Sequence, residues 1–350
     1  MLLLLSLACT PTTSDSGGDA VDPLSWPIGE DGPYQVGFQS WEVSYTSLEG
    51  SERTISVNAW YPTEDTTGAS AVYLGAFPDD ASLAEATLAA SAHNGTYPVH
   101  VHSHGYQGYG GTSADLMRHH ASHGWIAVAP DHINNTLLDH EDPLPTAHYV
   151  HRPEDITAAL DALEAQFPAA DTEAVVVSGH SFGASYTTWA SAGATFDADS
   201  LSTYCTELYE GQCSDAELSA FVSGELADPR VVAAIPMAGA IRRGFFGEDG
   251  HRSANVPVLL MSGTEDGDSV AESWDEMDGV ERVWVSLEGG CHQTFALGAC
   301  ETLDVAEGFR VVNAYALALG RSVVLGDASV GSVLDGSEEI SEVATVLLGE

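Results

Sequence analysis

The chain has 350 residues, of which 52 are Asp or Glu and 10 are Arg, with no Lys, so its formal net charge is −42. Such a charge argues against nucleic acids and anionic lipids as partners, because both would be repelled. The acidic residues are dispersed, which is typical of a solvated surface and not of a disordered acidic tail. Two explanations stay open, a surface adapted to high salt and compositional drift in the source genome.

The N-terminal segment has the composition of an export signal. Residues 1–8 form an apolar run that is too short to span a bilayer and that ends directly before Cys9. We interpret residues 1–9 as a signal peptide with Cys9 as the lipidation site, although the usual basic start is missing. Residues 10–25, rich in Thr, Ser, Gly and Asp, predict a flexible tether. We therefore expect an exported protein, either an outer-membrane lipoprotein or a secreted one, whose only membrane contact would be this anchor.

Residues 26–350 contain no linker, repeat or charge block and are predicted to form one domain. Two early alternating strands are followed by alternation of strands and helices, which predicts an α/β fold with a mostly parallel central sheet and helices on both faces. The expected strands are 39–47, 54–60, 98–103, 125–129, 174–178, 231–236, 257–261 and 282–287. The expected helices are 81–92, 112–123, 153–166, 182–192, 270–277 and 302–319.

Two segments fall outside this alternation. Residues 193–228 separate one predicted helix from the next strand, and we expect them to form a small cap over the carboxyl edge of the sheet, a remote surface insertion being the alternative. Residues 321–350 carry Leu and Val at helical spacing and are expected to pack on the edge of the domain as a C-terminal extension.

A G-x-S-x-G pattern lies between a strand and a helix. The β-branched run Ala174–Ser178 leads into Gly179, then Ser181 and Gly183, and a helix-compatible run follows over 184–192. In this context the pattern predicts a nucleophile elbow, a tight turn that exposes the serine hydroxyl and whose flanking glycines avoid steric collisions. Ser181 is therefore the candidate nucleophile; a Gly-rich turn with an ordinary surface serine is the alternative.

A nucleophilic serine needs a histidine as base, and in this architecture the base follows it in the chain. Only His251 and His292 come after Ser181. His251 precedes the strand expected to deliver the acid, whereas His292 follows the next strand through the turn at Gly289-Gly290. His292 is therefore the predicted base.

The orienting acid should follow a strand between the serine and the histidine. The apolar run 256–261 leads into a turn that contains Glu265, Asp266 and Asp268. We predict Asp266 as the acid, with Glu265 and Asp268 as the alternatives.

Acyl transfer also requires hydrogen-bond donors for the oxyanion. One should be the backbone N–H of Phe182, directly after the nucleophile. The other should come from the loop after strand 98–103, where Gly105 lets the backbone turn and Tyr106 offers its N–H.

Five short motifs resemble one family, the bacterial α/β-hydrolases akin to platelet-activating-factor acetylhydrolase, also described as dienelactone-hydrolase-related. The motifs are Gly32–Gly37, Ala59–Pro62, Ser103–Tyr106, Gly179–Gly183 and Gly263–Asp266. Residues 122–128 and 131–139 are in addition similar to the cutinases and polyester hydrolases, although these lack an insertion such as 193–228. The resemblance implies an α/β-hydrolase fold and serine esterase chemistry, and it leaves the substrate undetermined.

The other cysteines form two close pairs, Cys205 with Cys213 and Cys291 with Cys300. Even numbers and short spacings in an exported chain favour disulfides. The 14 histidines show no spacing typical of a zinc site, so we expect no metal.

These observations together predict a serine ester hydrolase, of the carboxylesterase or lipase type, that acts through an acyl-enzyme. We expect no cofactor, a monomer, and a small-molecule or lipid ester as substrate. The alternatives are a cutinase-like polyester hydrolase and a non-catalytic surface lipoprotein that keeps the hydrolase fold.

Overall fold

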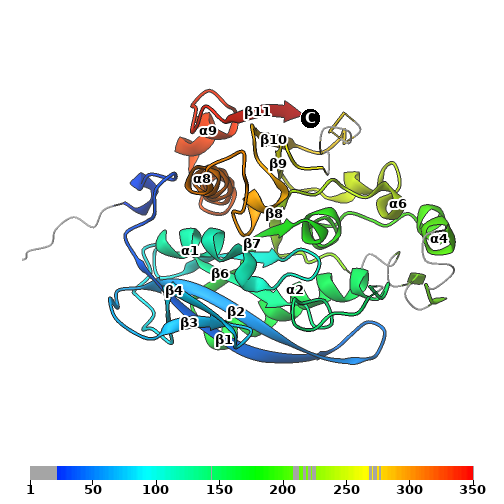
Figure 1. The fold of residues 1–350 in the computed structure, drawn as a ribbon, viewed down its shortest axis with the longest axis horizontal. Coiled ribbons are helices and arrows are strands. Elements are labelled where there is room, and N and C mark those ends of the chain that lie inside the picture. Colours follow the sequence, from blue (N-terminus) through cyan, green and yellow to red (C-terminus); the bar gives the residue numbers. More distant parts are fainter. Residues whose placement is uncertain are drawn as a thin grey trace, which may run out of the picture.

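The computed structural model describes residues 22–349 except 143, 208–212, 216–217, 220–221, 223–225, 268–269, 271–273 and 276. The described residues contain one sheet of 11 strands in the order β11-β10-β9-β8-β7-β5-β6-β2-β1-β4-β3 (Figure 1). The strands are β1 Gln35–Thr46, β2 Glu52–Thr63, β3 Ser70–Tyr73, β4 Phe77–Ala84, β5 Tyr97–Ser103, β6 Ile126–Asp131, β7 Ala170–His180, β8 Val231–Met237, β9 Val258–Gly263, β10 Arg282–Leu287 and β11 Ala344–Gly349.

The centre of the sheet is parallel and its margins are mixed. Strands β6, β5, β7, β8, β9 and β10 pair in parallel, whereas β1 pairs antiparallel with β2 and β11 pairs antiparallel with β10. The predicted fold class is therefore confirmed: this is a mostly parallel α/β sheet covered by helices. In such a sheet the carboxyl ends of the parallel strands meet at one edge, which is where ligands bind in this class of fold.

Helices cover both faces of the sheet (Figure 1). The longer ones are α1 Ala114–Ser122, α2 His148–Gln166, α4 Ala198–Glu207 and α8 Val305–Val324, and the short ones are α3 Thr188–Ser191, α6 Arg243–Phe246 and α9 Gly331–Leu334. Alternate residues of the central strands point to two apolar cores, one shared with α2 and α3 and the other with α1 and α8. Strand β7 is typical, because Val175 and Val177 belong to the first core and Val176 to the second.

Three predicted elements differ from the structure. Of residues 81–92, predicted as a helix, 81–84 instead form the end of strand β4, which pairs with β3 and, at its end, with β1. The predicted helix 153–166 begins earlier, since α2 starts at His148 and contains Pro153 inside it. The tail 321–350 ends in strand β11, although its Leu and Val spacing indicated a helix. The predicted helix 270–277 lies largely outside the described residues, as do Cys9 and the tether.

No helix within the described ranges has the length and apolar character needed to cross a membrane.

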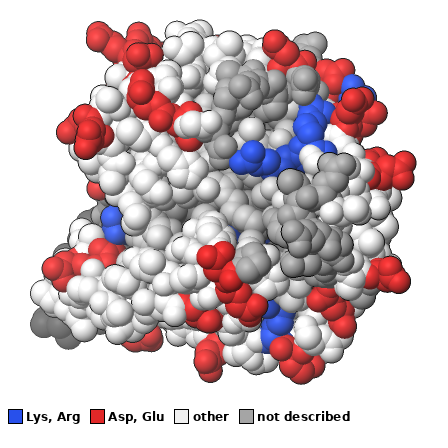
Figure 2. Space-filling view, turned by 45° about the vertical axis from the view of Figure 1, so that its right-hand side comes forward, with Lys and Arg blue, Asp and Glu red and all other residues white. Residues whose placement is uncertain are grey.

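The acidic side chains predicted from composition to be dispersed are spread over the face of the molecule that Figure 2 shows. Figure 2 shows Asp and Glu side chains distributed around one face and not gathered in one patch. Arginines are far fewer, in keeping with the composition.

Candidate active site

Ser181 lies in the tight turn directly after β7 and has a backbone φ of 54°, in the left-handed region that a non-glycine residue rarely adopts. The two flanking glycines are required by close packing. A Cβ on Gly179 would lie 2.4 Å from the carbonyl carbon of Gly183, and a Cβ on Gly183 would lie 2.1 Å from the carbonyl oxygen of Ser103. The turn therefore has the geometry of a nucleophile elbow.

His292 and Asp266 meet at the same edge of the sheet. Asp266 follows β9, and His292 begins the short 3₁₀ turn η5 (His292–Phe295) that comes after β10. The Nδ1 atom of His292 lies 3.0 Å from Oδ1 of Asp266, whose side chain is only 2% exposed. Glu265, the alternative acid, is exposed, and Asp268 lies outside the described residues.

The elbow and the histidine loop are joined through His180. Its Nε2 donates a hydrogen bond to the carbonyl oxygen of His292 over 2.9 Å, and the centroids of the two imidazole rings are 4.7 Å apart. Burial lowers the pKa of His180 to about 4, so its ring is neutral near pH 7. Because His180 directly precedes Ser181, this contact ties the loop that carries the predicted base to the turn that carries the predicted nucleophile.

The loop after β5 passes close to the nucleophile. A Cβ on Gly105 would lie 3.3 Å from Cβ of Ser181, closer than most Cβ contacts, so a larger residue would press the loop away from Ser181. Gly108 N–H donates to the Gly105 carbonyl over 3.0 Å and closes the turn around Tyr106. Phe182, the other predicted donor residue, is buried and begins the helical segment that follows Ser181. The structure thus places both predicted donor residues beside Ser181.

His104 stabilises the loop after β5 through two hydrogen bonds. Its Nε2 accepts a hydrogen bond from the backbone N–H of His132 over 3.0 Å, which leaves the proton on Nδ1, and Nδ1 donates to the Gly105 carbonyl over 2.7 Å. His104 lies directly beyond the end of β5. The rings of His100 and His102, on the strand itself, both hydrogen-bond to Ser178 Oγ, at 2.6 and 2.7 Å.

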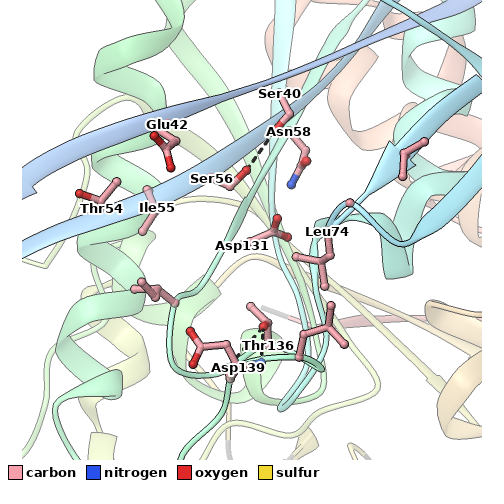
Figure 3. A pocket seen from close by; sticks show the side chains of 14 residues that line it. Ser40, Glu42, Thr54, Ile55, Ser56, Asn58, Leu74, Asp131, Thr136 and Asp139 are labelled. Carbon is pink, nitrogen blue, oxygen red and sulfur yellow. Dashed lines mark hydrogen bonds between the residues drawn. The ribbon is translucent and has the colours of Figure 1, made fainter. Parts of the chain in front are cut away.

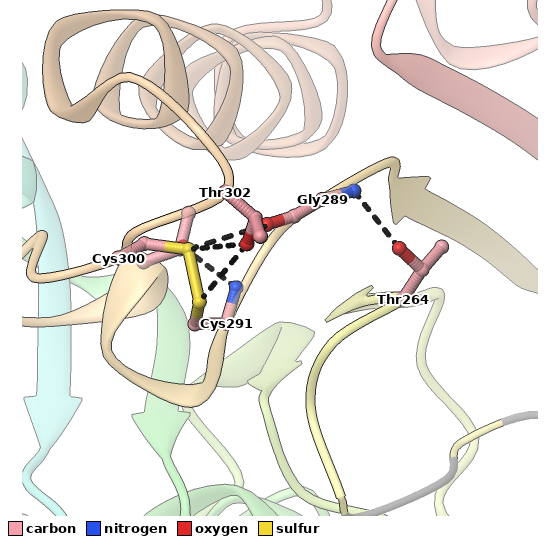
Figure 4. The surroundings of a disulfide bond; sticks show 6 residues. Thr264, Gly289, Cys291, Cys300 and Thr302 are labelled. Carbon is pink, nitrogen blue, oxygen red and sulfur yellow. Dashed lines mark hydrogen bonds between the residues drawn. A yellow bond between two sulfur atoms is a disulfide. The ribbon is translucent and has the colours of Figure 1, made fainter.

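Both predicted disulfides are present. Cys291 and Cys300 are bonded directly beside His292, and Cys205 and Cys213 are bonded at the end of α4. Around the first disulfide, Thr302 Oγ1 donates to the Gly289 carbonyl over 2.6 Å, and Gly289 N–H donates to Thr264 Oγ1 over 2.8 Å (Figure 4). The loop that carries the base is therefore fixed at both of its ends.

The insertion 193–228 packs close to the elbow where it is described. Tyr204 of α4 hydrogen-bonds through its hydroxyl to that of Tyr149 at 3.1 Å and packs against Phe245 with ring centroids 4.3 Å apart. Tyr149 in turn stacks on Phe182, with centroids 5.0 Å apart. An aromatic cluster thus links the insertion to the residue after the nucleophile.

Arg152 is the main site residue that sequence reasoning missed. It is fully buried on α2 and contacts both the loop after β5 and the ring of Phe182. A signal was present in the sequence: Arg152 lies at helical spacing before Ile156, Ala159 and Leu163, which are all buried. A charged residue on the apolar stripe of a helix indicates a buried polar interaction.

A separate pocket of about 450 Å³ lies between the early strands and the loop after β6. Ser40, Ser56 and Asn58 of β1 and β2 line one side of it, and Asp131 and Thr136 line the other (Figure 3). None of the three predicted triad residues lines this pocket.

No group of three or more His, Cys, Asp or Glu side chains in the described part of the chain could hold a metal ion. Most of the histidines are instead buried and neutral, since desolvation lowers the pKa values of their imidazoles.

Comparison with known proteins gives two likenesses. The family model described as chlorophyllase matches residues 79–202, a stretch that includes Ser181 but neither Asp266 nor His292. The solved structure of a ferulic acid esterase from Streptomyces cinnamoneus superposes with a TM-score of 0.64 at 20% sequence identity, covering 93% of this chain and 98% of that one. No curated protein matches the sequence.

The chain therefore has the α/β-hydrolase fold. The structural likeness extends over nearly its whole length, whereas the family match covers less than half of it. The particular resemblance to the platelet-activating-factor acetylhydrolase-related enzymes and to the cutinases stays a prediction.

Proposed function

We propose that this protein is a serine ester hydrolase in which Ser181 is the nucleophile, His292 the general base and Asp266 the orienting acid. The observation that carries the proposal is the 3.0 Å contact between His292 and Asp266 at the sheet edge where the strained turn presents Ser181. The esterase named in the structural comparison and the chlorophyllase family match support the same reaction class.

The proposed reaction has two stages. The Ser181 hydroxyl oxygen bonds to the ester carbonyl carbon while its proton passes to Nε2 of His292, and the carbonyl oxygen becomes an oxyanion held by the N–H groups of Phe182 and Tyr106. As the carbonyl re-forms, the bond to the alcohol oxygen breaks and His292 protonates the departing alcohol. A water molecule then gives its proton to His292 and attacks the acyl-enzyme, and collapse of this second oxyanion returns a proton to Ser181 and releases the acid.

The substrate proposed is a small-molecule or lipid ester with a short to medium acyl chain. The aromatic cluster that joins α4 to Phe182 supports a covered acyl site. We include in the same proposal the one-domain organisation of 26–350, the cap role of 193–228, and export with lipidation at Cys9.

The test is hydrolysis of a series of p-nitrophenyl esters by the wild-type chain and by Ser181→Ala. The alanine variant should keep the wild-type melting temperature and lose activity by several orders of magnitude, because the covalent route is removed. A fluorophosphonate probe should label Ser181 in the wild type only. Near-full activity in the variant would refute the triad.

Hydrolysis of a polyester film is the measurement that distinguishes this proposal from a cutinase-like activity. Soluble products released from the film at rates comparable with p-nitrophenyl butyrate hydrolysis would overturn the proposed substrate class. A wild-type chain that hydrolyses no ester and takes up no probe would instead favour the non-catalytic alternative.

A further inference from the structure

Arg152 is buried where three segments around Ser181 meet. Its guanidinium donates to the His104 carbonyl at 2.7 Å and to the Gly105 carbonyl at 3.0 Å. It also donates to Oδ1 of Asn135 at 2.9 Å, and the same Oδ1 accepts the backbone N–H of Gln107 at 3.3 Å. One side chain therefore fixes the loop before and after Tyr106.

The bond to the Gly105 carbonyl has a direct consequence for Tyr106. The Gly105 carbonyl and the Tyr106 N–H belong to one peptide group, which is planar and trans, so the N–H points opposite to the C=O. The same carbonyl oxygen also accepts from His104 Nδ1 at 2.7 Å and from Gly108 N–H at 3.0 Å, and Arg152 adds the charged donor to this set. Arg152 thereby helps to fix the direction of the Tyr106 N–H. A charged donor on the carbonyl also polarises the peptide group and strengthens the N–H as a donor.

Arg152 also contacts the side chain of Phe182, whose N–H is the other proposed oxyanion donor. The guanidinium carbon of Arg152 lies 4.5 Å from the centroid of the Phe182 ring, a cation–π geometry. The Phe182 ring also stacks on Tyr149, which lies three residues earlier on α2 and therefore one turn away. Helix α2 thus holds Phe182 through two of its side chains.

Burying the charged guanidinium of Arg152 costs solvation free energy. Among the described residues no carboxylate forms a salt bridge with it. Asp155, one turn further along α2, instead pairs with Arg53 at 3.1 Å and with His132 at 2.8 Å. Burial lowers the pKa of Arg152 to about 9, so the side chain stays charged near pH 7. A buried cation bound mainly to carbonyl oxygens costs stability relative to an apolar residue, which indicates a purpose other than packing.

We propose that Arg152 is the positioning residue of the oxyanion hole, orienting the N–H of Tyr106 through the Gly105 carbonyl and that of Phe182 through its ring. This inference rests on the proposed esterase function and adds to it the residue that organises both donors. Arg152 does not touch the substrate; it acts through the two peptide groups that do.

The experiment compares Arg152→Met and Arg152→Lys with Arg53→Met, using p-nitrophenyl butyrate below the melting temperature of each variant. Arg53 is a matched control, because it is a second buried arginine of the same network whose hydrogen bonds go to Tyr45, His151 and Asp155 and not to the two donor loops.

Arg152→Met should lower kcat by about 100-fold or more with KM changed less than about threefold, since loss of one oxyanion donor alone costs that much. Arg152→Lys keeps the charge without the planar fork and should lose only about tenfold. The rate of inactivation by a fluorophosphonate should fall in parallel with kcat/KM. Arg53→Met should be destabilised and yet keep kcat within about threefold.

A kcat within threefold of the wild type in Arg152→Met would overturn the inference, and so would equal losses of kcat in Arg152→Met and Arg53→Met. If Arg152→Met does not fold, the lysine variant decides, and an unchanged kcat there refutes the positioning role. A wild-type chain inactive on all esters would refute the proposed function itself, and this inference with it.

Discussion

At the scale of single residues, the geometry of the candidate site depends on how closely two backbone segments can approach each other. Ser181 takes a left-handed conformation, and the glycine two residues later lies against the carbonyl of Ser103 at the end of β5. The same contact joins the elbow to the strand that leads into the Tyr106 loop. Steric room at Gly183 therefore decides the relative placement of Ser181, the proposed nucleophile, and Tyr106, the proposed oxyanion donor.

Gly183→Ala should damage both stability and activity. Its Cβ would lie 2.1 Å from a backbone oxygen, so the chain must shift, at a cost of about 1–3 kcal/mol or more in the free energy of unfolding. A displacement of about 1 Å between the reacting groups can cost about 100-fold in kcat. Urea unfolding and ester kinetics measure the two effects.

The control is Gly331→Ala, at the start of α9, where a new Cβ meets nothing within 4 Å. This variant should be neutral or slightly more stable. Wild-type kinetics in Gly183→Ala would show that the elbow tolerates a side chain and that the packing argument is wrong.

At the scale of elements, the loop between β10 and α8 has to hold His292 although it contains two consecutive glycines. Without restraint, Gly289 and Gly290 would make the loop costly to order. The structure supplies the restraint through the Cys291–Cys300 disulfide and through Thr302, which bonds to the Gly289 carbonyl (Figure 4).

Replacing Cys291 and Cys300 by serine should lower both stability and kcat. Opening a loop of about ten residues costs about 2.7 kcal/mol in the chain-entropy model. The kcat should fall below the melting transition with a smaller change in KM, because His292 loses its placement. Differential scanning calorimetry and ester kinetics at one temperature check both effects.

The matched control is the serine pair at Cys205 and Cys213, whose sequence separation of 8 is close to the 9 of the first pair. It should lose comparable stability and keep kcat near the wild-type value. Peptide mapping that finds Cys291 and Cys300 as free thiols, or an unchanged kcat in their double variant, would contradict the restraint.

At the scale of the whole molecule, the chain buries an unusual number of neutral histidines. Burial lowers the pKa values of His102, His120, His123 and His148 to about 3 and holds those of His100, His104 and His132 well below 6.5. Four of these histidines lie in regular elements, on β5, α1 and α2, and the other three directly follow β5, α1 and β6. The core itself is therefore sensitive to acid.

We expect the free energy of unfolding to be constant with respect to these groups above pH 6.5 and to fall steeply below it. A histidine with a depressed native pKa takes up its proton only on unfolding, so acid favours the unfolded chain between pH 6.5 and about 3. At pH 5.5 each such ring costs on the order of 1 kcal/mol, so several of them together remove a large part of the stability of an ordinary protein. Urea unfolding at pH 7.5, 6.5 and 5.5 measures the effect.

One substitution and one control test whether the buried histidines cause this loss of stability in acid. His120→Phe removes a buried ring whose Nε2 has no hydrogen-bond partner and should reduce the proton uptake on unfolding by about one. The control, Leu138→Asn, replaces an exposed residue by one that does not titrate either and should leave that uptake unchanged. A free energy of unfolding that is flat between pH 7.5 and 5.5 would contradict the prediction.

The sequence by itself determined the features that depend on local chain chemistry. The glycine spacing around Ser181, set between a strand and a helix, predicted a tight turn at this residue, and the structure has such a turn after β7. The alternation of strands and helices predicted the sheet, and the cysteine spacing predicted both disulfides. The order of Ser181, Asp266 and His292 made them candidates, and the structure brings Asp266 and His292 into contact.

Only the tertiary structure decided what depends on distant partners. Residues 81–84, part of the predicted helix 81–92, join the sheet because β3 and the edge of β1 pair with this segment, and the pairing outweighs their local helical preference. The C-terminal strand β11 likewise needs β10 beside it. Arg152 could not be assigned from the sequence, because its hydrogen-bond acceptors lie 17 to 48 residues away along the chain. Which carbonyl a buried guanidinium meets is fixed only when α2, β5 and the elbow pack together.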